Sequence, residues 1–85
     1  LAEGMVKKYV KKSWSALDKA RKSCNLTEKE NYVVLFENVE CYISDAERFL
    51  NQGRDELAIL SIGYAEGLLD SLCLLSIDEF TEIWE

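Results

Sequence analysis

Apolar and polar residues recur at helical spacing through the first 24 positions of the chain. Apolar or small side chains follow one another three or four positions apart, and lysines fill the opposite half of the helical wheel. This pattern predicts an amphipathic helix over residues 2–24, with Trp14 and Arg21 at the border between the two halves. The predicted buried side comprises Met5, Val6, Tyr9, Val10, Ser13, Leu17, Ala20 and Cys24.

A second helix is predicted over residues 28–51. Thr27 and Glu30 have the spacing of a capping box, in which each side chain accepts a hydrogen bond from a backbone N–H of the other residue. Gly53 then supplies the left-handed residue that commonly follows a helix. The apolar stripe of this helix has the three- and four-residue steps of bundle packing: Tyr32, Leu35, Phe36, Val39, Tyr42, Ile43, Ala46, Phe49 and Leu50.

The third predicted helix, over residues 54–75, is apolar around nearly its whole circumference. A helix of this kind needs packing partners on two sides. The first two helices, the C-terminal tail or a second subunit could supply them. Gly63 and Gly67 each cost about 0.8–1.0 kcal/mol relative to alanine inside a helix. Close approach of another helix is the favoured reason for them, and a groove for a ligand or peptide is the alternative.

Ser76 and Glu79 repeat the capping-box spacing and predict a short helix over residues 77–84. Phe80, Ile83 and Trp84 form its apolar side, which we expect to fold back onto the other helices. If it does not fold back, these three residues form an exposed patch suited to a partner. The predicted fold is therefore all-α: a three-helix up-down-up antiparallel bundle with a short C-terminal fourth helix, in one domain over residues 1–85.

Charge is distributed unevenly along the chain, whose net charge is -6. Residues 1–24 hold seven of the ten basic residues, and the remaining residues are strongly acidic. A basic arm for nucleic acid, with Tyr9 or Trp14 stacking on bases, is one interpretation. A basic helix packed on its own acidic partners is the other, and the negative net charge favours it. The basic patch in question comprises Lys7, Lys8, Lys11, Lys12, Lys19 and Lys22.

The residue inventory offers little catalytic chemistry. The chain has no histidine, which excludes Ser-His and Cys-His nucleophiles within it. Cys24, Cys41 and Cys73 have none of the spacings of zinc or redox sites, so we interpret them as reduced and mostly buried thiols. No cofactor, metal or small-molecule substrate is indicated, and we expect a protein that is not an enzyme.

Glu66 and Asp70 stand four residues apart, so their carboxylates lie on one face of the third helix and repel each other. The compensating cation is expected from a lysine or arginine of the first helix, and a divalent metal or a basic partner is the alternative. Together with Tyr64 and Gly67, this pair forms the candidate interaction face.

Residues 57–77 are about as long as a membrane span, but Glu66 and Asp70 lie in the middle of the segment. We therefore expect a buried helix of a soluble protein that does not enter a membrane. The N-terminal stretch stays amphipathic where a signal peptide has an apolar region. These features predict a cytoplasmic protein.

Part of the chain resembles a known family. The residues that carry the resemblance are Asp45-Ala46, Phe49-Leu50, Gly53, Asp55, Ala58 and the run Tyr64-Ala65-Glu66-Gly67-Leu68-Leu69-Asp70-Ser71-Leu72. They are similar to the archaeal domain-of-unknown-function family 357. The resemblance implies a small all-helical domain of archaeal proteins with no assigned activity.

The sequence thus predicts a non-catalytic helical module for protein–protein interaction or self-association as a homodimer. It would bind through the face of Tyr64, Glu66, Gly67 and Asp70 or through the tail of Phe80, Ile83 and Trp84. Nucleic-acid association through the basic first helix is the alternative function, and the net charge disfavours it.

Overall fold

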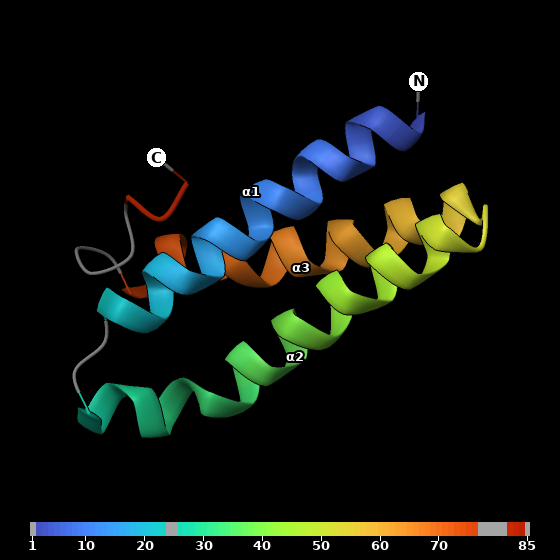
Figure 1. Cartoon of the computed structure of the whole chain (residues 1–85). Coiled ribbons are helices and arrows are strands. Elements are labelled where there is room, and N and C mark those ends of the chain that lie inside the picture. Colours follow the sequence, from blue (N-terminus) through green and yellow to red (C-terminus); the bar gives the residue numbers. More distant parts are fainter. Residues whose placement is uncertain (1, 24–25, 77–81, 85) are drawn as a thin grey trace.

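The computed structural model describes residues 2–23, 26–76 and 82–84, and within them the chain is all-helical with three α-helices and no strands. The helices are α1 (Ala2–Ser23), α2 (Leu26–Asn51) and α3 (Asp55–Ser76). Figure 1 shows α2 running in the opposite direction to α1. α3 then runs opposite to α2 and in the same general direction as α1. Each helix packs against the other two.

The turn between α2 and α3 forms as the sequence predicts. Gly53 has a φ of 71°, a left-handed conformation that only glycine adopts at little cost. The Gly53 N–H donates to the carbonyl of Leu50 at 3.0 Å, and the Arg54 N–H donates to the carbonyl of Phe49 at 2.8 Å. These two bonds make a Schellman motif, which satisfies carbonyls left unpaired at the end of α2.

The helix starts differ slightly from the predicted ones. α2 begins at Leu26, before the predicted start at residue 28, so Thr27 lies inside its first turn instead of preceding it. The capping bond predicted between Thr27 and Glu30 lies outside the described side chains. α3 begins at Asp55, one residue later than predicted, and the N–H of Ala58 donates to the carbonyl of Arg54 at 3.1 Å.

One apolar core lies between the three helices and confirms most of the predicted stripes. Every residue of the predicted α2 stripe is buried or half-buried, whereas Met5 and Tyr9 of the predicted α1 stripe are exposed. Both exposed residues lie at one edge of that stripe, in the first half of α1. The core comprises Val6, Val10, Ala16, Leu17, Ala20, Phe36, Val39, Ile43, Ala46, Ala58, Ile62, Ala65, Leu69, Leu72 and Ile83.

Two side-chain contacts join α1 to α2 at the surface. The Arg21 guanidinium lies 2.6 Å from the carboxylate of Glu40, and the Trp14 indole N–H donates to Oε1 of Glu47 at 3.2 Å. Arg21 of α1 therefore pairs with an acidic residue of its own chain, as expected for a basic helix packed on acidic partners.

The C-terminal segment folds back onto the helices where it is described. Ile83 is buried and Trp84 is half-buried, and both pack on the core. Glu82, Ile83 and Trp84 form a turn. Most of the short helix predicted over residues 77–84, Phe80 included, lies outside the described residues.

Candidate functional site

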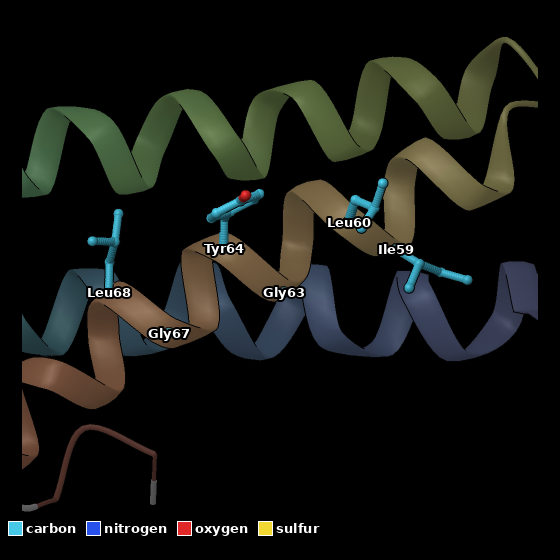
Figure 2. Close-up of a pocket in the computed structure, with 6 residues that line it drawn as sticks. All are labelled: Ile59, Leu60, Gly63, Tyr64, Gly67 and Leu68. Atoms are coloured by element: carbon cyan, nitrogen blue, oxygen red, sulfur yellow. The ribbon is translucent and has the colours of Figure 1, made fainter.

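The exposed side of α3 carries an open apolar groove. All of its lining residues are uncharged, and it has a volume of about 430 Å³. We call this surface the α3 groove. Figure 2 shows the side chains of Leu60, Tyr64 and Leu68 pointing toward α2 and that of Ile59 pointing to the opposite side. The lining residues are Ile59, Leu60, Gly63, Tyr64, Gly67 and Leu68.

The two glycines of α3 form the floor of the groove, beside the row of Leu60, Tyr64 and Leu68 (Figure 2). A Cβ added at Gly63 or at Gly67 would meet no atom within 4 Å. Close approach of another helix, the favoured reason for these glycines, does not occur within the described part of the chain, and close approach of a helix from another chain stays a prediction. Their absent side chains leave the α3 backbone open to solvent.

The burial of α3 also differs from the prediction that both of its sides are packed. The face containing Ala58, Ile62, Ala65 and Leu69 is buried in the core, whereas Leu60 is 60% exposed and Tyr64 is 63% exposed. The segment Asp55–Leu74 is long and apolar enough to cross a membrane, but the core helix of a soluble protein can have the same length and composition. The described tail residues do not line the groove.

Tyr64 is held in place by α2. Its ring stacks on the ring of Tyr42, with centroids 5.3 Å apart and an angle of 20° between the planes. Stacked aromatic pairs at this separation contribute about 0.5–1.5 kcal/mol beyond the area that they bury. Because this contact fixes Tyr64 on the α2 side, the groove has a preformed wall.

Glu66 and Asp70 lie on the other flank of α3, beside α1, and not with Tyr64. Here they line a second hollow of about 280 Å³ together with Tyr9, Lys12 and Trp84. The Trp84 indole N–H donates to Oδ1 of Asp70 at 2.8 Å. The predicted interaction face is therefore divided: Tyr64 and Gly67 belong to the α3 groove, and the two carboxylates belong to what we call the acidic hollow.

The pKa of the Glu66 carboxyl is raised above its ordinary value. Partial burial is the main cause, repulsion from Asp70 adds to it, and attraction to Lys12 acts in the opposite direction. A lysine of α1 therefore does lie close enough to interact with Glu66, as the sequence predicts for a compensating cation. This attraction is smaller than the effects of burial and of Asp70, so the pKa of Glu66 stays raised.

The lysines of α1 are exposed, apart from the half-buried Lys19. Two of them form ion pairs with acidic residues one helical turn away: Lys7 with Glu3 at 2.8 Å, and Lys22 with Asp18 at 2.9 Å. Lys12 lies over the ring of Tyr9, 6.0 Å from its centroid. The remaining predicted members, Lys8 and Lys11, are exposed on the same helix.

The aromatic residues that were expected to stack on nucleic-acid bases have other positions. The Trp14 indole N–H is bonded to Glu47, and Trp14 is half-buried against the core. Tyr9 is exposed and lines the acidic hollow. Trp14 is therefore engaged with α2, whereas Tyr9 is exposed beside Lys12.

The cysteines offer no common site. Cys41 is exposed, whereas Cys73 is half-buried and the pKa of its thiol is raised by burial and by the nearby carboxylate of Asp70. Cys24 lies outside the described residues. The exposure of Cys41 corrects the expectation of mostly buried thiols. Within the described part of the chain, no group of three or more His, Cys, Asp or Glu side chains could hold a metal ion.

Sequence reasoning missed most of the groove. It selected Tyr64 and Gly67, but not Ile59, Leu60 or Leu68, because an exposed leucine and a buried leucine on an all-apolar helix look alike. Gly63 was singled out together with Gly67 for its helical cost, and a groove for a ligand or peptide was the alternative reason considered for the two glycines. The signal that could have identified the groove is the presence of Gly63 and Gly67 on one helix face, opposite Ala58 and Ala65. Both glycines lower helix stability, so their common face needs a reason.

A family model described as protein of unknown function DUF357 matches residues 8–77 of the chain. Searches of curated proteins and of solved structures found no match. The family match therefore extends over nearly all of the three helices and includes every residue of the α3 groove.

Proposed function

We propose that this chain, which belongs to the domain-of-unknown-function family 357, is a non-catalytic helical module that docks a protein partner in the α3 groove. The observation that carries this proposal is the exposure of Leu60 and Tyr64 beside two glycines that no other helix of the described residues contacts. Burying one such aliphatic side chain stabilises a complex by about 1.5–3 kcal/mol. Covering the groove therefore offers a partner a substantial gain.

The loss of helix stability that the two glycines cause also supports this proposal. Each lowers the stability of the isolated helix by about 0.8–1.0 kcal/mol relative to alanine, and packing within the described chain does not require either of them. A partner that contacts the α3 backbone supplies a reason for their presence. Self-association through the same groove is included in the proposal as one form of docking.

The proposed architecture is the up-down-up bundle, closed at one end by the C-terminal segment. The short fourth helix over residues 77–84 stays a prediction, as do the archaeal source and the cytoplasmic location. Ile83 and Trp84 already contact the core and Asp70, so they are less suited to a partner than the α3 groove is.

Nucleic-acid association through α1 remains the alternative function. The exposed Lys8, Lys11 and Lys12 favour it, whereas the contact between Trp14 and Glu47 speaks against base stacking. This alternative predicts binding to single-stranded DNA or RNA that weakens steeply with added salt. Substituting the three lysines with glutamine should then abolish binding.

A peptide-display selection on the full chain tests the proposal. Leu60→Glu places a charge in the groove, and Val34→Glu places the same charge on an exposed residue of α2 outside the groove. We expect selected peptides to bind the wild type and Val34→Glu, but not Leu60→Glu. Recovery of no peptide, or only of peptides that bind Leu60→Glu equally well, overturns the proposal.

A further inference from the structure

The α3 groove has an acidic edge along one side. Residues three or four apart are neighbours on a helix surface, so Glu66 adjoins Gly63 and Asp70 adjoins Gly67. The carboxylates lie on the flank toward α1, with Lys12 and Trp84, and Tyr64 lies on the flank toward α2. The glycine floor therefore separates an apolar wall from a pair of carboxylates.

The charges of α3 are all of one sign. The helix carries Asp55, Glu56, Glu66 and Asp70, and it has no lysine or arginine. Of the two carboxylates beside the floor, Glu66 has a pKa that is raised mainly by partial burial and further by repulsion from Asp70. A group that brings positive charge to this edge relieves the repulsion, and a group that brings negative charge increases it.

We propose that the occupant of the α3 groove is a basic amphipathic helix of a partner protein, with apolar side chains on Leu60, Tyr64 and Leu68 and lysine or arginine beside Glu66 and Asp70. This inference rests on the proposed docking function and adds the chemistry of the partner. Recognition of this kind lays the apolar face of a helix into an apolar groove and uses flanking charges for selectivity.

The shape of the groove suits a helix. Its lining residues extend over residues 59–68 along one straight face of α3, which at about 1.5 Å per residue is roughly 14 Å, or between two and three turns of a docked helix. The missing side chains at Gly63 and Gly67 allow a partner backbone to approach closely. Large partner side chains then reach the walls at Ile59 and Tyr64.

The chain itself contains an example of this recognition. α1 is a basic amphipathic helix that packs on both α2 and α3, and Arg21 of α1 pairs with Glu40 of α2 at 2.6 Å. The side of α3 that carries the α3 groove also has an apolar strip beside carboxylates, but no helix of the described chain covers it. A second basic helix would find similar chemistry there.

Charge distinguishes this occupant from two others. A second copy of the chain that docks through its own α3 brings four further carboxylates, on a chain with a net charge of -6. An anionic membrane surface brings negative charge to the same acidic edge. Both meet like-charge repulsion that a basic helix does not meet.

A titration with matched peptides tests the inference on the full chain. One labelled peptide of about 20 residues has leucine at helical spacing and lysine elsewhere, and its counterpart has glutamate in place of lysine. We expect the lysine peptide to bind the wild type and Val34→Glu, with an affinity that falls as salt increases. Leu60→Glu should weaken binding about tenfold or more, even though it makes the chain more acidic.

Variants of the acidic edge test the charge component. Glu66→Gln with Asp70→Asn removes two charges beside the floor, and Glu30→Gln with Glu37→Gln removes two exposed charges of α2. We expect the first pair to weaken binding of the lysine peptide about tenfold and the second pair to have a much smaller effect. Equal effects of the two pairs mean attraction to net charge alone and overturn the inference.

Other outcomes separate this inference from the proposed function. If the glutamate peptide binds as well as the lysine peptide and Leu60→Glu abolishes both interactions, the groove docks partners but the basic partner is wrong. If light scattering finds a dimer that Leu60→Glu dissociates, a second copy covers the groove and the inference is also wrong. Sedimentation with vesicles of phosphatidylcholine and phosphatidylglycerol that is lost in Leu60→Glu assigns the groove to a membrane and overturns both proposals.

Discussion

The indole N–H of Trp84 donates a hydrogen bond to the Asp70 carboxylate at 2.8 Å, and this bond ties the end of the chain to α3. Ile83, the preceding residue, is buried in the core. The C-terminal turn therefore belongs to the packed structure through a hydrogen bond of Trp84 and through the apolar packing of Ile83 and Trp84.

The apolar contact of the tail should contribute more stability than the polar one. We expect Ile83→Ala to cost about 2 kcal/mol of unfolding free energy, and Trp84→Phe, which keeps a ring and removes the N–H donor, to cost about 1 kcal/mol or less. Urea denaturation measures both. Glu82→Ala, at the exposed neighbouring residue, is the control. An Ile83→Ala chain as stable as this control would show that the tail does not contribute to the core.

Two leucines of α3 separate core packing from surface exposure. Leu69 is fully buried, whereas Leu74 is 79% exposed. Leu69→Ala should lower the unfolding free energy by about 3 kcal/mol because it leaves a cavity, and Leu74→Ala should change it by less than about 0.5 kcal/mol. Thermal or urea unfolding followed by circular dichroism measures the difference. Similar losses at the two positions would contradict the burial of only one face of α3.

The glycines should respond to alanine in opposite ways. Gly63→Ala and Gly67→Ala should each stabilise the chain by about 0.5–1 kcal/mol, because alanine favours the helix and the new methyl group meets no atom within 4 Å. Gly53→Ala should destabilise it by about 1 kcal/mol, because its φ of 71° is unfavourable for a residue with a Cβ. Equilibrium unfolding of the three variants checks the signs. A loss of stability at Gly63 or Gly67 contradicts the open groove floor.

The same alanine variants also test docking. If a partner helix contacts the α3 backbone, a methyl group at Gly67 should weaken binding of a groove-directed peptide while the chain becomes more stable. Opposite effects on stability and on binding are typical of a residue kept for function. Fluorescence anisotropy with the lysine peptide measures the binding change, and unchanged affinity in both glycine variants argues against close approach of the partner.

The raised pKa of Glu66 makes the stability of the chain depend on pH. Because the folded chain binds this proton more tightly than the unfolded chain does, its contribution is favourable below the unfolded pKa and is lost as the pH rises through the folded pKa. Glu66→Gln should therefore be more stable than the wild type at neutral pH. The difference should disappear as the solution becomes acidic, which unfolding curves recorded across the carboxyl range can measure.

Asp70→Asn provides the matching test by NMR titration of the Glu66 carboxyl. Removing the neighbouring negative charge should lower the pKa of Glu66 toward its ordinary value, and Lys12→Met should raise it further. A Glu66 pKa that does not respond to Asp70→Asn would show that the two carboxylates do not interact.

The sequence by itself determined the three helices, the α2–α3 turn and the family. Spacing of apolar residues located each helix to within two residues, because a core-facing stripe and a helical period of 3.6 residues leave few alternatives. Gly53 marked the turn because few residues other than glycine adopt the left-handed conformation there. The run from Tyr64 to Leu72 carried the family resemblance.

Only the tertiary structure decided which side of α3 is covered. On a helix that is apolar all round, the spacing of apolar residues does not identify the buried face. The exposed Leu60 and the buried Leu69 therefore could not be distinguished from the sequence, and only the packing of α1 and α2 on one face separates them. For the same reason the spacing grouped Tyr64 with Glu66 and Asp70, which the packing then divided between the α2 flank and the α1 flank. The groove exists because α1, α2 and the described tail residues 82–84 do not cover the whole circumference of α3.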